Sequence, residues 1–513
     1  MPNLDDHRKV VSEKHKIFAL NQPFSIFEFI ETNFGGCDSI RRVFSLARSA
    51  KAVSLILEVI PPFGIILEEN EDISSKFPTY APGALIRASF WSVPIPEADN
   101  PPLSSDNFIG YAILKEDPIL HPSCVWHVFE AVFPKYNHHH NCVPRPKKYQ
   151  VRVLQKILET EGVLYCQQNQ LNKACAQVAL RSLLSRMVDD GDISYRTINR
   201  LAEPERPGFI WGKGLSIKQM RRVVTELGFK YNDVNYDEGG AKARRNLPYQ
   251  KYAYAGLESG GGALLGFTLL GRPGKHIIPI YGHTFNKDTW VPDANLAYFQ
   301  LGKHLGYIPS ENWTSSFLAH DDNFGPNYCV PRLYIDKKNV GYVMEIFRPG
   351  IKSSGVNAEA LAVSILYSIL DNHADLTNPW VARLKKWADD KSVILRSQAM
   401  KKEEYITHLR SIEDWEGNRE KAEICDSLGK GLPNFIWVVE ISTPQLFPAN
   451  ERKIGEIVLD ATKEITSKKS YNSLFVLARL PETYLFGGVI KKKAPEFTPI
   501  ESQIKSHSSL IRV

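Results

Sequence analysis

The sequence predicts a mixed α+β fold that is divided among several domains. Its 513 residues are more than one hydrophobic core usually holds. Up to residue 150, short β-branched or aromatic runs alternate with Pro, Gly and Asn turns, as is typical of strands. Beyond that point helical and strand-like patterns are mixed. We therefore expect a mostly β accessory domain over residues 1–150, a second domain over 151–330, and an α+β domain with a flexible tail over 331–513.

Local patterns predict the elements of the first 150 residues. Residues 1–22 are polar and charged, which indicates a loosely held arm. Two short helices and then four strands are expected at 25–33, 38–47, 52–60, 84–93, 108–114 and 124–133. Residues 138–142 combine three histidines with a cysteine, but side chains that are adjacent in sequence do not face one ion without a special loop. Because Pro144 and Pro146 follow, we interpret this segment as an exposed linker and expect neither a metal nor a cofactor.

The remaining chain alternates between helical and strand periodicity. Helices are expected at 151–159, from Cys175 to just before residue 189, and at 216–227, 359–370, 379–387, 403–413 and 451–465. Strands are expected at 162–166, 231–236, 264–270, 340–347, 434–442 and 473–480. Residues 275–284 and 289–293 are two strand-like runs around an Asn-containing turn, which predicts a hairpin.

Composition excludes several functional classes. The net charge of +6 is mild for this length and gives no reason to expect nucleic acid as a partner. Seven scattered cysteines do not form a disulfide framework and favour a reducing compartment. The N-terminus lacks the apolar run of a signal peptide, and the best membrane candidate, residues 52–67, is short and contains Glu58 and Pro61-Pro62. We expect a soluble cytoplasmic protein with no membrane partner.

Cys175 is the first candidate functional residue, because it opens a buried helix. The unpaired N–H groups and the dipole at a helix start stabilise a thiolate there. A thiolate that attacks an acyl carbon also needs a base and a group that orients the base. The predicted hairpin offers His276 and His283 at the ends of its first strand, and Asp293 at the end of its second. In this hairpin His276 would pair with residues a few positions after Asp293. Asp293 would then be offset from His276 by about 10 Å along the strand.

This chain order resembles the papain-like cysteine peptidase superfamily, most closely the bacteriocin-leader-processing type of peptidase domain. The resemblance covers about residues 151–300. It is carried by Cys-Gln-Gln-Asn-Gln-Leu-Asn-Lys-Ala-Cys-Ala-Gln-Val-Ala-Leu at 166–180, Gly-Ala-Leu-Leu-Gly-Phe-Thr-Leu at 262–269 and His-Ile-Ile-Pro-Ile-Tyr-Gly-His at 276–283. In the superfamily the catalytic His opens a strand and an aromatic–Gly pair follows it. Tyr281-Gly282 fits that pair, which favours His276 over His283.

The resemblance implies a papain-like core with Cys175 as nucleophile, His276 as general base and acid, and Asp293 as orienting residue. The oxyanion glutamine of the family usually precedes the cysteine by six residues, where this chain has Asn169. The neighbouring glutamines are Gln167, Gln168 and Gln170. We choose Gln168 as the oxyanion donor. The family also often has Gly after the cysteine, where this chain has Ala176.

The leading hypothesis is therefore a cysteine peptidase that cleaves a peptide or isopeptide bond in a protein or peptide substrate through a thioester, without a cofactor. The alternative is a catalytically degenerate papain-like domain that serves as a binding or scaffold module, which the irregular glutamine spacing favours. A single cysteine on an apolar helix is ordinarily a small core residue. The peptidase hypothesis thus depends on Cys175, His276 and Asp293 together.

Overall fold

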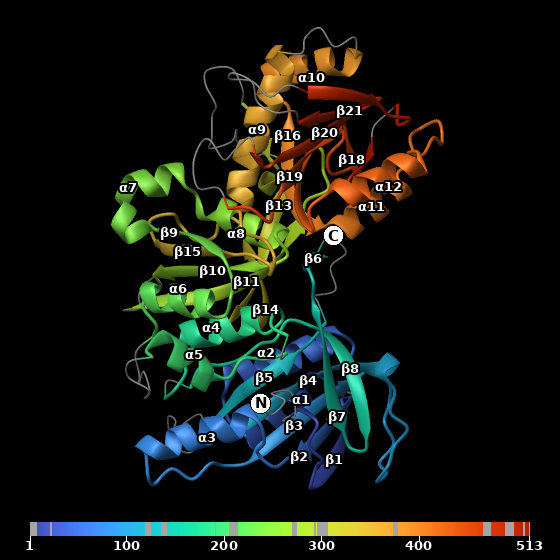
Figure 1. The fold of residues 1–513 in the computed structure, drawn as a ribbon. Coiled ribbons are helices and arrows are strands. Elements are labelled where there is room, and N and C mark those ends of the chain that lie inside the picture. Colours follow the sequence, from blue (N-terminus) through green and yellow to red (C-terminus); the bar gives the residue numbers. More distant parts are fainter. Residues whose placement is uncertain are drawn as a thin grey trace. The chain divides into compact units, whose positions relative to one another are not determined.

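The computed structural model describes residues 8–20, 23–117, 125–134, 141–169, 171–189, 191–204, 214–268, 274–291, 294, 306–372, 378–464, 473–487, 497–505 and 508–511. Helices and strands are mixed along the chain, which confirms the predicted α+β class (Figure 1). Within the described residues, no helix combines the length and the apolar character needed to cross a membrane.

The chain forms two compact units, and each is built from several stretches of sequence. Unit 1 comprises Met1–Gly228, Leu264–Gly282 and Phe317–Val330. Unit 2 comprises Phe229–Ala263, His283–Ser316 and Pro331–Val513. Residues 151–330, expected as one domain, contribute to both units. The division into three domains stays a prediction.

The first sheet of unit 1 is antiparallel, with the strand order β1-β2-β3-β4-β5. Its strands are β1 (Lys14–Ala19), β2 (Ser54–Val59), β3 (Leu85–Trp91), β4 (Phe108–Glu116) and β5 (Trp126–Val132). Helices α1 (Pro23–Phe34) and α2 (Asp38–Ser49) share an apolar core with this sheet. In that core Phe44 of α2 lies edge-on to Phe90 of β3, with 5.2 Å between ring centroids. The sequence predicted these two helices and the strands β2 to β5 correctly.

Residues 8–20 do not form the loose arm that their polar composition suggested. Residues of β1 pair with β2 from Lys14 opposite Val59 to Ala19 opposite Ser54. Arg8 is fully buried, and its guanidinium forms ion pairs with Glu130 and Asp192. The charge that suggested a solvated arm is thus matched by buried carboxylates.

A hairpin replaces the helix expected over residues 151–159. Strands β7 (Lys147–Val153) and β8 (Lys156–Gly162) pair antiparallel. Every second residue is buried, including Tyr149 and Val151, so the period is that of a strand. Leu154 forms the turn with φ of 51°.

The short strand β6 (Asn141–Cys142) precedes this hairpin in the sequence. Cys142 is buried, so the exposed-linker interpretation was wrong for that residue.

The remaining helices of unit 1 are α3 (Ile65–Lys76), α4 (Cys175–Leu184), α5 (Tyr195–Ala202) and α6 (Ile217–Glu226). A 3-10 turn, η2, spans Ser105–Asn107. Helix α6 ends before Gly228, which has φ of 82°, as the sequence predicted. Residues 138–140, which carry the three predicted linker histidines, lie outside the described residues.

Four strands contribute residues to both units and carry the candidate site. They are β10 (Gly262–Thr268), β11 (Lys275–Phe285), β13 (Thr314–Asp321) and β14 (Gly325–Pro331), in the order β14-β13-β11-β10. Thr284 bonds to Ser315, and His276 contacts Asp321, so β11 and β13 run antiparallel. The predicted hairpin is wrong, because β11 lies between β13 and β10 in the sheet and residues 289–291 are not in a strand.

Unit 2 is built around a sheet with the order β12-β16-β17-β19-β20-β21-β22. Its strands are β12 (Ile308–Pro309), β16 (Ile394–Lys401), β17 (Phe435–Ser442), β19 (Gly455–Asp460), β20 (Phe475–Leu480), β21 (Thr483–Gly487) and β22 (Phe497–Glu501). Helices α9 (Gly355–Asn372) and α10 (Pro379–Asp389) share a core with alternate residues of β17, such as Trp437. Helices α11 (Lys402–Ser411) and α12 (Ala422–Gly431) share another core with the intervening residues, such as Val438. The sheet is therefore covered on both faces (Figure 1).

The other elements of unit 2 are β9 (Tyr231–Asn235), α7 (Tyr236–Asn246), α8 (Tyr249–Glu258), η3 (Ser310–Trp313), β15 (Val340–Ile346), β18 (Arg452–Lys453) and β23 (Ser508–Ser509). Strand β19 replaces the helix expected over residues 451–465, since it pairs with β17 and β20 and is buried throughout. Two strands, β22 and β23, lie in the tail that was expected to be flexible, and Leu510 and Ile511 are buried. That expectation was wrong because apolar residues anchor the tail.

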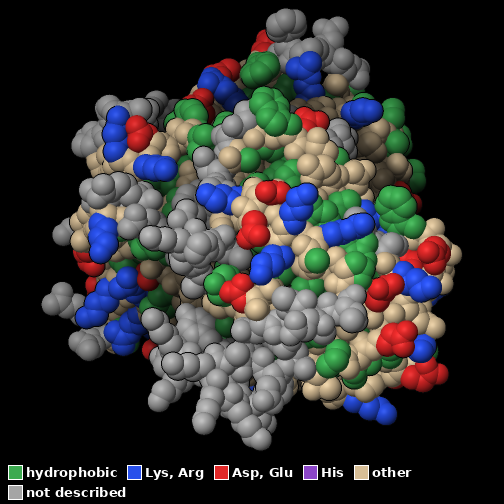
Figure 2. Space-filling model, turned by 90° about the horizontal axis from the view of Figure 1, so that it is seen from above, with side chains coloured by type: hydrophobic (Ala, Val, Ile, Leu, Met, Phe, Trp, Pro, Cys, Tyr) green, Lys and Arg blue, Asp and Glu red, His purple; other side chains and the backbone are tan. Residues whose placement is uncertain are grey.

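Side chains of both charges are interspersed on the face of the molecule drawn in Figure 2. Lys and Arg side chains stand beside Asp and Glu side chains over the described part of this face. This distribution agrees with the mild net charge of +6.

Candidate active site

The candidate nucleophile, Cys175, is the first residue of α4 and is partly exposed. The preceding Ala174 has extended backbone angles, so the helix begins at the cysteine. All other residues of α4 are buried. The first N–H groups of a helix have no acceptor within it, and they favour negative charge. The one solvent-accessible residue of α4 is therefore a thiol at its electropositive end.

The loop that leads to Cys175 is held by Asn169. The side-chain oxygen of Asn169 accepts bonds from the backbone N–H groups of Leu171, Asn172 and Lys173 at 3.0, 3.2 and 3.3 Å. Its amide donates to Asn172 Oδ1 at 2.8 Å. Asn169 is buried and fully engaged within its own loop. It therefore shapes the approach to the nucleophile, although it stands where the peptidase family has its oxyanion glutamine.

Two buried ion-pair clusters fix the loop and the helix in unit 1. Lys173 Nζ lies 3.1 Å from Glu69 in the first cluster. In the second, Arg181 of α4 lies 2.8 Å from both Glu130 and Asp192. All these side chains are almost completely buried. The position of Cys175 is thus set by charges on both sides of it in the sequence.

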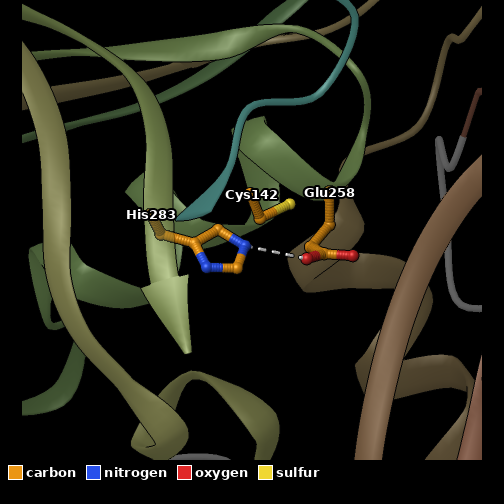
Figure 3. Close-up of side chains that lie close together, drawn as sticks. All are labelled: Cys142, Glu258 and His283. Atoms are coloured by element: carbon orange, nitrogen blue, oxygen red, sulfur yellow. Dashed lines mark hydrogen bonds and ion pairs between the residues drawn. The ribbon is translucent and has the colours of Figure 1, made fainter. Parts of the chain in front are cut away.

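The candidate base, His276, is the second residue of β11 and is only 5 % exposed. The Cys175 side chain lies close enough to the imidazole to raise the pKa of His276. Phe267 of β10 lies edge-on to the ring, with 5.6 Å between centroids. The structure thus places Cys175 and His276 near one another. The alternative base, His283, lies in unit 2, where its Nε2 is 3.2 Å from Glu258 (Figure 3).

Two carboxylates that the sequence analysis missed contact the base. Asp321 Oδ2 lies 3.2 Å from His276 Nε2, and Asp322 Oδ1 lies 3.4 Å from the same nitrogen. Both carboxylates therefore lie at the Nε2 edge of the ring. The other oxygen of Asp321 accepts the N–H groups of Asn323 and Phe324 at 2.9 and 3.2 Å. Asp321 is thus held by a turn while it orients the imidazole.

Asp293, the carboxylate expected from the sequence, lies outside the described residues. Asp321 fills the geometric place that was predicted for it, at the end of the strand next to the one that His276 opens. The sequence does contain a signal for this site, since a strand-like run ends in Asp321-Asp322-Asn323. It was missed because β13 was not recognised as the partner of β11.

Gln168 lies next to the turn that carries the orienting carboxylate. Its side-chain nitrogen donates to Asn323 Oδ1 at 2.6 Å. Gln167 instead accepts the Val128 N–H at 2.9 Å. Gln170 lies outside the described residues. Of the described glutamines considered as oxyanion donors, Gln168 is therefore the one tied to the residues around His276.

Charge at the site favours the imidazolium. Burial disfavours the charged ring, but hydrogen bonds to Asp321 and Cys175 and the charges of both carboxylates outweigh it and raise the pKa of His276 to about 10. Burial raises the pKa of the Asp322 carboxyl to about 7, against the opposing effect of His276. A protonated imidazole beside Cys175 is the counterion that a thiolate needs.

We expect His276 to remain protonated throughout the neutral range. Its folded-state pKa is raised above the ordinary 6.5. The imidazolium therefore contributes stability fully below about pH 6.5, and this contribution is lost as the pH rises toward 10. The measurement is the NMR titration of the His276 ring, with Asp321→Asn expected to lower its pKa. Titration near 6.5 in the unmodified protein would contradict the geometry of the pair.

Three other buried residues, Glu69, Asp117 and His127, lie close together and are of types that can bind metal ions. Their arrangement has another explanation. The ammonium of Lys115 lies 2.9 Å from Glu69 and 3.2 Å from Asp117, and Lys173 also contacts Glu69. Two lysines thus already supply the positive charge, so we interpret this cluster as a structural ion-pair network.

No protein-family model, curated protein or solved structure matches the chain. The function is therefore inferred from the side chains of the site. They comprise a partly exposed thiol at a helix start, an imidazole near it, and two carboxylates at Nε2 of that imidazole. These are the residue types that can serve as nucleophile, base and orienting group.

Proposed function

We propose that the protein is a cysteine peptidase with a papain-like catalytic arrangement. The observation that carries the proposal is that the Cys175 side chain lies near the His276 imidazole, whose Nε2 contacts Asp321. Cys175 is the nucleophile and His276 is the general acid and base. Asp321 takes the orienting role that the sequence assigned to Asp293. The substrate is a protein or peptide, and the scissile bond is a peptide or isopeptide bond.

The chemistry follows from these roles. The Cys175 thiolate attacks the acyl carbon, a C–S bond forms, and the carbonyl oxygen becomes an oxyanion. His276 then gives its proton to the departing amine as the C–N bond breaks, which leaves a thioester. Water attacks the thioester, His276 takes a proton from that water, and the C–S bond breaks to release the acid. Asp321 keeps the imidazole in the orientation that both proton transfers need.

Stabilisation of the oxyanion is assigned to two donors. The backbone N–H of Cys175 belongs to the first turn of α4 and has no acceptor within the helix. The side-chain amide of Gln168 is the second donor, a type of interaction worth about 3 kcal/mol in the transition state. It must exchange its bond to Asn323 for one to the oxyanion.

That exchange is also what favours the alternative function. The side-chain amides of Gln168 and Asn169 are both candidates for the second oxyanion donor, and both already have partners. Gln168 donates to Asn323, and Asn169 donates to Asn172 in its own loop. A papain-like domain that serves as a binding or scaffold module would need no free donor. Reactivity of the thiol distinguishes this alternative, because a scaffold has no reason to activate Cys175.

The proposal is tested by alkylation with iodoacetamide at neutral pH, with each labelled cysteine located by peptide mass spectrometry. Cys329 is exposed and burial raises its pKa, so it serves as an internal reference. We expect Cys175 to react at least about tenfold faster than Cys329, because only it has an imidazolium partner. His276→Ala should remove this advantage. Equal rates for Cys175 in both proteins would favour the scaffold function.

A further inference from the structure

We propose that His276, Asp321 and Asp322 form a binding site for a divalent metal ion such as Zn²⁺, and that the bound ion switches off the thiol chemistry. Nε2 of the histidine and one oxygen of each carboxylate lie within 4.8 Å of one another. Imidazole nitrogen and carboxylate oxygens are common zinc ligands. The metal site does not depend on the proposed function. The switching effect does rest on the proposed function.

The spacing of these atoms fits a shared ion better than strong hydrogen bonds. A charge-assisted N–H···O bond is usually about 2.7–2.9 Å long. The two carboxylate oxygens lie 3.2 and 3.4 Å from Nε2. In a tetrahedral site with metal–ligand bonds of 2.0–2.2 Å, ligand atoms are separated by about 3.3–3.6 Å. The distances from Nε2 to the two carboxylate oxygens are thus close to those that one shared ion requires.

Asp322 is the strongest indication of a cation site. Its side chain is only 4 % exposed, and neither of its oxygens accepts a hydrogen bond from the described residues. A buried carboxylate without such partners is costly. Asp321 already orients the imidazole and is fixed by its own turn. Asp322 therefore duplicates the orienting carboxylate, whereas a metal ion would use both.

The contrast with the structural cluster at Glu69 supports this assignment. There, the ammonium groups of Lys115 and Lys173 neutralise the carboxylates. At the His276 site, the ion pairs of Asp321 and Asp322 within the described residues are with His276 alone. Asp321 is 17 % exposed, which gives an ion a route from solvent. Two carboxyl groups thus face one imidazole at a site that solvent can reach.

Occupancy would block catalysis through the charge of the histidine. Coordination forms a metal–nitrogen bond at Nε2, and the Nε2 proton leaves to solvent. The coordinated ring keeps a single proton and is neutral. In this state the thiolate loses its imidazolium partner. The ion would therefore hold the site in an inactive form without touching the sulfur.

The binding test is calorimetric titration of Zn²⁺ into the full chain carrying Cys175→Ala. We expect one site whose affinity is weakened at least tenfold by a further Asp322→Asn. The control is Asp336→Asn, a fully exposed carboxylate, which should bind as the parent does. Loss of the site in Cys175→Ala itself, which would make the thiol the ligand, would overturn the proposal. So would unchanged affinity in Asp322→Asn, with its fold verified by circular dichroism.

The switching test is alkylation of Cys175 with and without Zn²⁺. Saturating Zn²⁺ should slow labelling at least tenfold, a chelator should restore it, and Asp322→Asn should show a smaller ratio of the two rates. Slow labelling without metal, together with intact calorimetric binding, would reject the peptidase and retain the metal site. Fast labelling without calorimetric binding would reject the metal site alone. Hydrolysis that requires Zn²⁺ and survives Cys175→Ala would overturn both the peptidase and the switch.

Discussion

Replacing Cys175 by Ala is expected to reduce peptide hydrolysis by about 10⁴-fold or more, to the background rate. The reason is that no covalent intermediate can form once the sulfur is removed. His276→Ala should produce a loss of similar size, because residues that act as one unit are not additive. The measurement is the appearance of new peptide termini, by mass spectrometry, in a peptide mixture incubated with each protein.

The matched control for this experiment is Cys329→Ala. Cys329 is exposed and contributes no contact to the candidate site among the interactions described above. Its replacement should leave the rate within a factor of about two, as is usual for surface positions. Equal hydrolysis by the Cys175→Ala protein would show that the thiol is not the nucleophile and would remove the peptidase proposal.

Replacing Arg181 by Met is expected to cost about 3–5 kcal/mol of stability in the α4 region. Arg181 is completely buried, with bonds to Asp192 at 2.8 and 3.1 Å and to Glu130 at 2.8 Å. Arg8 contacts the same two carboxylates. Without Arg181, two buried negative charges would share one positive charge. The measurement is the opening free energy of α4 amides by hydrogen exchange, since a chain of two compact units does not guarantee two-state unfolding.

Arg196→Met is the control for the arginine experiment. Arg196 also contacts two carboxylates, Glu71 and Asp72, but its side chain is 41 % exposed. Exposed pairs are screened by water, so its loss should cost no more than about 1 kcal/mol. A similar loss for both arginines would mean that burial does not set the strength of the Arg181 cluster.

The sequence predicted elements whose periodicity is local and long. Helix α9 and strand β17 follow from apolar patterns that any environment would preserve. The errors arose where tertiary pairing decided the outcome. Residues of β19, which include Glu456 and Asp460, lie in a segment that was expected to be helical. In the fold both are buried, and the Glu456 carboxylate is matched by Lys453 and Arg479. A buried ion pair leaves no signal in the hydrophobic pattern of one segment.

The candidate site was predictable to a similar degree. Cys175 could be placed at a helix start and His276 at a strand start, because both depend on neighbouring residues. The orienting carboxylate depends on which strand lies next to β11. The last residues of an antiparallel neighbour do lie beside the first residues of β11, as the sequence analysis expected. The neighbour that provides Asp321 is β13, however, and it is separated from β11 in the sequence by residues 286–313.

The separation of these segments has a consequence during synthesis. Asp321 lies 45 residues after His276, and His276 in turn lies far beyond Cys175. A ribosome adds roughly 5–20 residues per second, so the thiol emerges many seconds before its imidazole and the carboxylate that orients it. A nascent chain thus carries Cys175 without the imidazole that lies near it in the fold. The order of translation itself delays assembly of the candidate site until the strands on both sides of His276 have been made.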